Sequence, residues 1–379
     1  MTARNRRIID AGAIRENMAA IRAAVPAAAK IMAVVKADGY GHGAVTAARA
    51  ALSGGAEALA VATVEEGSEL RNAGLSEPVI LVLGAVSAAD ADIGIANGLT
   101  LTVCSPEMVK ICQEAADALD REALVHLKID SGMGRIGIRT EEEKNAVLRA
   151  PAVCPRVRMT GVYTHFSDAD GNTEGEEYTK EQFRRFLALS EGLKGIRHCA
   201  NSAAALRHPE WALDMVREGI SLYGYPPVET GLDLRPCMRW EAKVSYVKDV
   251  PAGAFISYGR TWQAEKPARI ATVTCGYGDG YHRAASGRAE VLIRGRRAKV
   301  LGRICMDQMM ADITEIPDVC PEDPVVLMGT DGNETITAED IARWSGTISY
   351  EVLLSCGSRV KRETDFISGK QDKTEGNGR

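Results

Sequence analysis

Short apolar runs alternate with helix-like segments up to about residue 230, and this alternation restricts the fold more than any other feature. Segments suited to helix separate most of the runs, for example residues 44–52, 64–73, 106–119 and 177–193. The apolar runs begin near Ile31, Ala58, Val79, Leu99, Leu124, Val157, Ile196 and Met215. Such alternation is typical of βα units with a parallel sheet, and eight units close a (β/α)8 barrel.

An open, doubly wound sheet is the alternative for this pattern. It predicts a glycine-rich dinucleotide turn, GxGxxG, after the first strand. No such turn follows residues 31–35. We therefore predict an α/β fold in which a TIM-type (β/α)8 barrel occupies residues 1–234.

Beyond about residue 234, strand-like runs follow one another without long helices between them. They cover residues 242–248, 255–258, 270–275, 289–293, 298–303 and 325–328. One helix is expected at residues 337–344, because Thr337 and Asp340 form a capping pattern. We predict a mainly β C-terminal domain over residues 235–379, with a polar tail from about residue 368 to residue 379.

Composition excludes several classes of protein. The 379 residues are 45% hydrophobic and 26% charged, with a net charge of −5 and no long basic block, so nucleic acid is not an expected partner. The longest apolar stretch is far below the ~20 residues of a membrane span, and the N-terminal segment lacks a signal-peptide core. Nine cysteines without a CxxC pair indicate reduced thiols rather than a metal site. We expect a cytoplasmic protein with neither metal nor membrane partner.

Polar side chains follow the predicted strands at their carboxyl ends. These residues are Lys36, Lys128, Asp130, His165, Asn201, Ser202 and Arg217. The carboxyl ends of barrel strands meet at one face, where barrel enzymes have their active sites. The sequence therefore predicts that these residues share one site.

Lys36 lies directly after an apolar strand, in the segment AVVKADGYGHG. A lysine at such a place is costly unless its amine has a partner or a covalent role. Burial lowers the pKa of a lysine, and a deprotonated amine can bond to an aldehyde. The neighbouring glycines permit positive φ angles and a close approach to a ligand. On this spacing alone, a purely structural lysine stays an alternative.

Nine segments resemble, in the same order, those of the alanine racemase family. VVKADGYGHGA is similar to the family's cofactor-lysine signature. The others are LKIDSGMGRIG, THFSDAD, HCANSAAAL, REGISLYG, SYGRTW, GYGDGY, GRICMDQMM and TISYEVL. This resemblance implies a pyridoxal 5'-phosphate-dependent isomerase that interconverts L-alanine and D-alanine and supplies D-alanine for peptidoglycan.

A seat for the cofactor phosphate is expected after strands seven and eight, where this barrel commonly binds phosphate. Asn201 and Ser202 lie at a strand-to-helix turn, where a hydroxyl and free amides can hold an anion. Gly219 and Ile220 follow the eighth strand. Taken alone, Ser202 would more often be a helix cap.

The resemblance assigns further residues to the cofactor. The arginine matching Arg217 faces the pyridine nitrogen, which should stay unprotonated because arginine does not readily give up a proton. His165 matches the residue that supports the ring, and Tyr40 and Tyr350 match residues that bind the phosphate. The alternatives are a surface pair between Arg217 and Glu218, and an ordinary core histidine at position 165.

Racemisation removes the Cα proton from one face of the substrate and returns a proton from the other. Lys36 can serve one face, and the resemblance assigns Tyr258 to the other. Because the reference pKa of tyrosine is ~10, a nearby cation must favour the phenolate. Arg135 is the matching cation and would also hold the substrate carboxylate. The alternative for Tyr258 is an ordinary strand aromatic.

Family members place this tyrosine over the cofactor of a partner subunit, which implies a head-to-tail homodimer with shared active sites. Met306, through its backbone amide, would join Arg135 at the substrate carboxylate. Tyr277, Cys305, Asp307 and Tyr350 would line the path of substrate access.

Lys128 matches a family lysine that can carry a carbamate and so hold Arg135 in place. An ordinary salt bridge to Asp130 is the alternative account.

Two other functions remain open at this point. A decarboxylase of basic amino acids shares the plan of barrel and β domain but lacks the SYG context of Tyr258. A non-catalytic pyridoxal-phosphate-binding protein would resemble the barrel alone. Serine differs from alanine by one hydroxyl, and such pockets discriminate only about 100-fold, so a serine or broader small amino-acid racemase is the alternative on substrate.

Overall fold

The computed structural model describes residues 4–150 and 154–365, which form two compact units. The barrel unit is Ile14–Pro236, and the β unit combines the residues up to Ala13 with those from Cys237 onward. The expected boundary near residue 234 lies close to the observed one, but the first residues depart from the expected 1–234 barrel. The expected polar tail, residues 368–379, lies outside the described residues.

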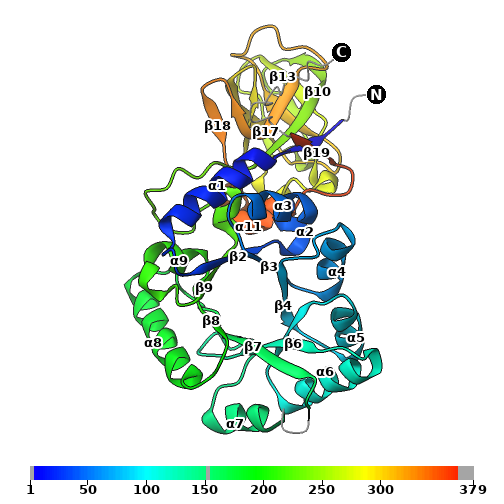
Figure 1. Ribbon diagram of the computed structural model, residues 1–379. Coiled ribbons are helices and arrows are strands. Elements are labelled where there is room, and N and C mark those ends of the chain that lie inside the picture. The colour runs from blue at the N-terminus through cyan, green and yellow to red at the C-terminus, as the bar shows by residue number, and fades with distance from the viewer. Residues whose placement is uncertain (1–3, 151–153, 366–379) are drawn as a thin grey trace, which may run out of the picture. The chain divides into compact units, whose positions relative to one another are not determined.

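The barrel unit contains an eight-stranded parallel sheet in the order β8-β7-β6-β5-β4-β3-β2-β9. Backbone bonds from Asp214 N to Arg197 O, 3.2 Å, and from Arg217 N to Ala200 O, 3.0 Å, link its two edge strands, and Figure 1 shows the closed ring. The (β/α)8 prediction is confirmed. The strands are β2 (Lys30–Val34), β3 (Ala58–Val61), β4 (Val79–Ala85), β5 (Thr100–Val103), β6 (Ala123–Lys128), β7 (Val157–Tyr163), β8 (Ile196–His198) and β9 (Met215–Glu218).

Helices cover the outside of this ring (Figure 1). The longer ones are α1 (Ala11–Ala24), α3 (Ala44–Ser53), α4 (Val64–Asn72), α5 (Ala88–Ala96), α6 (Pro106–Leu119), α7 (Glu141–Arg149) and α8 (Thr173–Ser190). Helix α6 shows why the sequence predicts them: Ser105 Oγ accepts from Met108 N at 3.2 Å, and Pro106 fills the first turn, where no N–H is needed.

The β unit is built on a nine-stranded sheet in the order β18-β17-β14-β15-β16-β13-β10-β1-β19. Its strands are β1 (Arg6–Asp10), β10 (Met238–Val250), β13 (Ala268–Val273), β14 (Glu290–Ile293), β15 (Arg296–Leu301), β16 (Met309–Asp312), β17 (Pro324–Asp331), β18 (Glu334–Ile336) and β19 (Lys361–Asp365). Strands β11 (Phe255–Ile256) and β12 (Trp262–Gln263) form a separate hairpin. The mainly β prediction is confirmed.

Strand β1 explains the shifted boundary. It pairs in parallel with β19 and antiparallel with β10, so the first strand of the chain belongs to the β unit. The barrel therefore follows β1 and precedes the rest of that sheet. Patterns of apolar residues could not reveal this, because RRIID and KRETD are short and largely polar.

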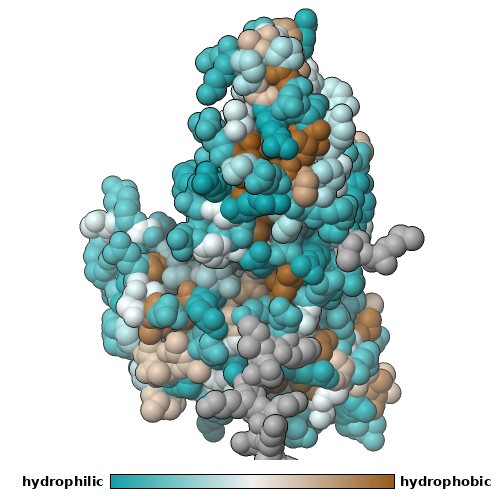
Figure 2. All heavy atoms as spheres, turned by 90° about the horizontal axis from the view of Figure 1, so that it is seen from above, coloured by the Kyte–Doolittle hydropathy of each residue, from teal (hydrophilic) through white to brown (hydrophobic). Residues whose placement is uncertain are grey.

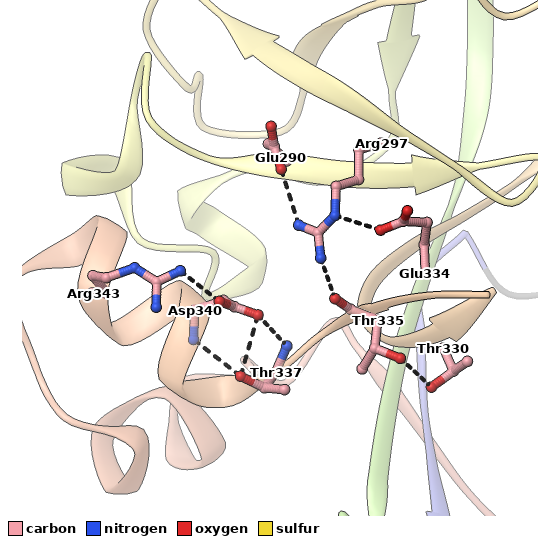
Figure 3. Close-up of polar contacts among 8 residues, drawn as sticks. All are labelled: Glu290, Arg297, Thr330, Glu334, Thr335, Thr337, Asp340 and Arg343. Carbon is pink, nitrogen blue, oxygen red and sulfur yellow. Dashed lines mark hydrogen bonds and ion pairs between the residues drawn. The ribbon is translucent and has the colours of Figure 1, made fainter. Parts of the chain in front are cut away.

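The predicted helix of the β unit is α10 (Ala338–Ser345), and Figure 3 shows its capping box. Thr337 Oγ1 accepts from Asp340 N at 3.1 Å, while the Asp340 carboxylate accepts from Thr337 N at 2.9 Å. Nearby, the Arg297 guanidinium contacts Glu290 on β14 and Glu334 on β18, at 2.9 and 2.6 Å. These bonds tie the strands around β15 to one another.

Polar residues cover most of the face drawn in Figure 2, with hydrophobic residues in small groups between them. Within residues 4–150 and 154–365, no helix is both long and apolar enough to cross a membrane.

Candidate active site

Lys36 begins α2 (Lys36–Tyr40), separated from the end of β2 by Val35, and is half-buried. Burial lowers the pKa of its amine, and the positive charges of Arg135 and Arg217 lower it further. Glu66 acts in the opposite direction. A lysine in such surroundings has a deprotonated fraction at neutral pH larger than that of an exposed lysine, which suits both covalent and base chemistry.

The chain after Lys36 forms a left-handed turn. Ala37, Asp38, Gly39 and Tyr40 have φ angles of 51°, 52°, 62° and 52°, although only one of them is glycine. Non-glycine residues rarely adopt this conformation, and clusters of them mark functional sites. Asp38 secures the turn, since its Oδ1 accepts from Ala44 N at 3.0 Å and its carbonyl accepts from Gly43 N at 2.7 Å.

Tyr40 is directed by this turn into a cluster of rings and hydroxyls. Its ring lies 5.0 Å from that of Tyr223, and a Cβ added to Gly219 would lie 3.0 Å from its hydroxyl. The same Cβ would lie 3.7 Å from Ser202 Oγ, which accepts from Gly219 N at 2.8 Å. Two hydroxyls thus converge on a glycine backbone, leaving a cradle that a side chain would fill.

The other predicted phosphate residues flank this cradle. Asn201 caps α9 (Ser202–Arg207), its Oδ1 accepting from Ala204 N at 3.0 Å. Ile220 is buried and begins a 3-10 turn directly after Gly219. Asn201 is therefore the helix cap, the role that the alternative had given to Ser202.

Arg217 is 3% exposed and is held by four acceptors. Its Nη2 contacts Thr164 O at 2.8 Å, Cys199 O at 2.9 Å and His165 Nδ1 at 3.4 Å, while Nη1 lies 3.0 Å from His198 Nδ1. Among the described residues, none accepts from its Nε–H. The Nε–H of this rigidly held guanidinium is therefore available to a ligand.

Two histidines continue this network inside the barrel. Because Arg217 can only donate, His198 Nδ1 must accept, and its Nε2–H then donates to His126 Nδ1 at 2.9 Å. Burial is the main cause that lowers the pKa of His126 to about 4 and that of His198 well below its usual value. Burial also lowers the pKa of His165. These imidazoles are neutral at pH 7 and fix Arg217 without adding charge.

Lys128 is 2% exposed, and its Nζ has no hydrogen-bond partner in the described part of the chain. The amine lies 4.5 Å from the centre of the Tyr163 ring. Burial lowers its pKa well below the usual value, and Arg217 and Arg135 add to this effect. Asp130, its proposed salt-bridge partner, instead accepts from Gly134 N at 2.9 Å. The described ion pairs do not include the predicted alternative.

Glu218 is fully buried rather than at the surface, so the surface pair with Arg217 is wrong. Neither carboxyl oxygen has a hydrogen-bond partner among the described residues. Burial raises the pKa of the Glu218 carboxyl to about 8, although the side chain of Ser202 lowers it by a smaller amount. Glu218 is therefore mainly a neutral acid at pH 7, which lets it stay buried without a cation.

In the β unit, Tyr258 lies in a tight turn after β11 and is 68% exposed. Ser257, Gly259 and Arg260 around it have φ angles of 68°, 71° and 51°. The Ser257 hydroxyl donates to Arg303 O and fastens the turn to the loop after β15. The alternative of a tyrosine on an apolar strand face does not apply, because the side chain points into solvent in this chain.

Tyr258 lines a pocket of about 470 Å³ together with five neighbours from the β unit. These are Ser257, Cys305, Met306, Asp307 and Gln308. Cys305 O accepts from Tyr277 N at 3.0 Å, which brings Tyr277 beside the same loop. Tyr350 lies on α11 (Ser349–Leu354) and is not among the residues of this pocket. Thus the predicted residues of the β unit, except Tyr350, gather at one place.

Some residues of the site escaped sequence reasoning. Glu66 accepts hydrogen bonds from two backbone N–H groups near Lys36, but in the sequence it is one of several polar residues of the expected helix 64–73. His126 and His198 gave a weak signal, as polar residues within apolar strands. Their partnership depends on a register between distant strands.

Comparisons with known proteins cover both units. Residues 9–227 match the family model "Alanine racemase, N-terminal domain", and residues 237–364 match "Alanine racemase, C-terminal domain". The chain is 44% identical over 364 residues to an alanine racemase of Desulforamulus reducens, covering 93% of this chain and 97% of the relative. An alanine racemase of Halothermothrix orenii is 41% identical, with 94% and 95% covered.

Solved structures agree with these relatives. The structure of alanine racemase from Bacillus anthracis with bound L-Ala-P has a TM-score of 0.89 and 36% identity, covering 96% of each chain. That of alanine racemase from E. faecalis has a TM-score of 0.88 and 36% identity, covering 96% of this chain and 98% of the other.

Proposed function

The chain belongs to the alanine racemase family, and we propose that it interconverts L-alanine and D-alanine with Lys36 and Tyr258 exchanging protons on opposite faces of the substrate. The chain is thus an enzyme of the isomerase class. The observation that carries the proposed chemistry is the half-buried Lys36, whose amine lies among Arg135, Arg217 and Glu66. Such an amine can be both an anchor for a cofactor and a base.

The barrel residues fit pyridoxal 5'-phosphate as the cofactor. Lys36 offers an amine for its aldehyde, and the cradle of Tyr40, Ser202 and Gly219 offers donors for its phosphate. Arg217 would offer its Nε–H to the ring nitrogen. The bound cofactor would draw electrons from the substrate Cα and so make the Cα–H more acidic.

Arg217 limits how far this effect goes. A guanidinium donates a hydrogen bond to a ring nitrogen but does not transfer its proton. Arg217 would therefore leave that nitrogen neutral and limit the electron withdrawal by the ring, which would favour proton return at Cα over side reactions. The neutral His198 and His126 behind Arg217 support this arrangement, because they hold the guanidinium without competing for a proton.

Lys36 would take or return the proton on one face of Cα, since its lowered pKa favours the neutral amine. Tyr258 would serve the other face, with Arg135 favouring its phenolate and binding the substrate carboxylate beside the Met306 amide. We propose that this Tyr258 belongs to the partner in a head-to-tail homodimer. The exposure of Tyr258 supports this arrangement, because an exposed phenol can reach a second subunit.

Lys128 is proposed to add CO2: its amine nitrogen attacks the carbon, and a proton is released to give a carbamate. Two features of the residue support this reaction, namely the lowered pKa, which favours the neutral amine, and the lack of a hydrogen-bond partner among the described residues. The product would place a negative charge near Arg135 and Arg217. A 13C resonance from enzyme equilibrated with 13CO2, absent in Lys128→Met, is the expected result. No such resonance in the unchanged protein would contradict the proposal.

The decisive assay follows L-alanine and D-alanine by chiral chromatography, with and without added pyridoxal 5'-phosphate. Interconversion in both directions to an equal mixture is expected, and the cofactor should restore a depleted sample. Release of CO2 from carboxyl-labelled arginine or lysine would favour the decarboxylase instead. Serine should be racemised more slowly than alanine, by about 100-fold, because one hydroxyl is a modest basis for discrimination. Faster turnover of serine would reverse the assigned preference.

The product suggests a cellular role in the cytoplasm, the supply of D-alanine for peptidoglycan. Expression of this chain in a bacterium that needs added D-alanine should remove that need, and the Lys36→Ala variant should not. Growth that still depended on D-alanine, with active enzyme in the extract, would argue against this role.

A further inference from the structure

Glu66 joins the ends of two neighbouring barrel strands through its carboxylate. Its Oε1 accepts from Ala37 N at 2.7 Å, directly after Lys36. Its Oε2 accepts from Ala62 N, also at 2.7 Å, directly after β3. Each carboxylate oxygen thus satisfies one backbone N–H, and charge-assisted bonds of this kind are shorter and stronger than neutral ones.

This contact differs from ordinary helix capping. Glu66 is the third residue of α4, and its N–H reaches Thr63 Oγ1 at 3.4 Å. In a capping box its carboxylate would bond back to Thr63 N. Here it bonds to Ala62 N and spans to the next strand end, so the side chain does more than start its own helix.

The strand end that Glu66 reaches is the strained one. Ala37 is the first of four consecutive residues with positive φ, and an alanine in that conformation requires support from its surroundings. Asp38 secures the far side of the turn through Ala44 N. Glu66 secures the near side, one residue from Lys36.

Glu66 also balances the charges around the Lys36 amine. The groups that act on Lys36 come from three elements: Arg135 follows β6, Arg217 lies on β9 and Glu66 lies on α4. Burial is the main cause that lowers the pKa of His165, after β7, and the positive charge of Lys36 adds a small part. Burial and both arginines disfavour the protonated amine, whereas Glu66 favours it.

We propose that Glu66 is a positioning residue that holds the backbone at Lys36 and keeps a carboxylate charge beside the strand end from which Lys36 projects. The inference rests on the proposed role of Lys36 as the cofactor lysine. The two arginines lower the pKa of the Lys36 amine and so make it a weaker base. The negative charge of Glu66 opposes this effect and keeps the amine basic enough to accept a proton.

The test compares Glu66→Gln with Glu65→Gln, since Glu65 is an exposed neighbour on the same helical turn. Each holoenzyme is titrated with pH while the visible absorbance of the lysine-bound cofactor is recorded. Without the carboxylate charge, the midpoint should fall by about one pH unit in Glu66→Gln. Glu65→Gln should titrate as the unchanged protein does. A folded Glu66→Gln with an unchanged midpoint, or an equal shift in Glu65→Gln, would overturn the inference.

Glu66→Asp separates charge from reach. The shorter side chain keeps its charge but cannot span both amides, so the midpoint should stay close to that of the unchanged protein. The visible circular dichroism of the bound cofactor should change and the Tm should fall. If both the circular dichroism and the Tm stayed unchanged, the bridging role would be wrong, even where Glu66→Gln did not fold. Absence of lysine-bound cofactor in the unchanged protein would instead refute the proposed function itself.

Discussion

Lys36 and Tyr258, the two proposed bases, lie in opposite surroundings. Lys36 is half-buried in the barrel unit, and charges from three elements of that same unit act on its amine. Tyr258 is 68% exposed at a turn of the β unit. The barrel unit therefore supplies the environment of its own base. The β unit presents its base uncovered, as expected for a group that acts on another surface.

The backbones around the two residues show a likeness and a difference. Both lie beside residues with positive φ, which fix the direction of a side chain at some cost in stability. At Lys36 the strain extends over four residues and is held by Asp38 and Glu66. At Tyr258 the described side-chain support comes from Ser257, whose hydroxyl donates to Arg303 O and also lies 3.5 Å from Cys305 Sγ.

Removal of the barrel's base should have the largest effect. Lys36→Ala should reduce racemase activity by more than about 10³-fold, because both the cofactor anchor and one proton-transfer group are lost. The visible absorbance of lysine-bound cofactor should vanish as well. A persistent lysine adduct, detected by borohydride reduction and peptide mass, would assign the anchor to another residue.

Tyr258→Phe tests the other side of the comparison. Activity should fall by about 10²- to 10⁴-fold through loss of one acid–base group. Because the side chain is exposed, the Tm and the cofactor absorbance should barely change. The rate at which the Cα proton exchanges with deuterium from solvent should fall more for one enantiomer of alanine than for the other. Equal loss from both would contradict one base for each face.

Mixed dimers of these two variants test where the uncovered base acts. After subunit exchange between Lys36→Ala and Tyr258→Phe, about a quarter of full activity should return, since about half of the dimers then hold one intact site. A mixture that exchanges subunits, shown by differently tagged chains, and yet stays inactive would place both bases in one subunit.

The buried acid of the barrel gives a pH-dependent test. Glu218 keeps its proton up to about pH 8 in the folded chain, whereas an unfolded chain releases it near pH ~4.3. Its contribution to stability is therefore present at low pH and lost as pH rises through this window, by at most about 1.4 kcal/mol per pH unit. Glu218→Gln has no carboxyl to titrate and so does not lose stability in this way. The difference between its Tm and that of the unchanged protein should therefore shift in favour of the variant up to about pH 8 and then level off.

The control for this test is Glu229→Gln, which changes an exposed carboxyl of the same unit. Its Tm should run parallel to that of the unchanged protein from pH 5 to 9. Parallel curves for Glu218→Gln as well would show that Glu218 does not titrate in this range.

The smallest effect is expected at the strained turn of the β unit. Ser257 has φ 68° and ψ −178°, a region suited to glycine. Ser257→Gly should relieve about 1 kcal/mol of strain but lose the bond to Arg303 O, so the Tm should change little. Activity should fall a few-fold because Tyr258 is held less firmly. Ser257→Ala, which keeps the strain without the bond, should be the less stable of the two.

Sequence reasoning reached different depths in the two units. The alternation of strands and helices predicted the barrel, since its strands, apart from the closing pair of β2 and β9, pair with the next strand in the chain. The pairing of β1 with β19 could not be predicted, because short polar strands carry no pattern that identifies a distant partner. The left-handed conformation of Ala37 and Asp38 could not be predicted either, because positive φ angles were expected at the neighbouring glycines.

The roles of side chains were hardest to predict where the same short sequence fits either a surface residue or a buried one. Arg217 and Glu218 are adjacent in sequence, which left a surface pair open as an alternative, yet both side chains are buried. Burial of this kind depends on the whole barrel and cannot be read from two residues. The position of the Glu66 carboxylate near Lys36 likewise depends on how β2 and β3 lie beside each other, which the sequence alone does not show.

Strand β1 has a consequence for biosynthesis. A ribosome makes Arg6–Asp10 before the barrel, whereas the sheet partners of this strand, Met238–Val250 and Lys361–Asp365, are made only after the whole barrel. At usual translation rates the first strand waits on the order of tens of seconds, and the barrel can fold meanwhile as an inserted domain. A truncation at the N-terminus should therefore spare the barrel and impair the β unit, whose edge the missing strand would leave open to aggregation.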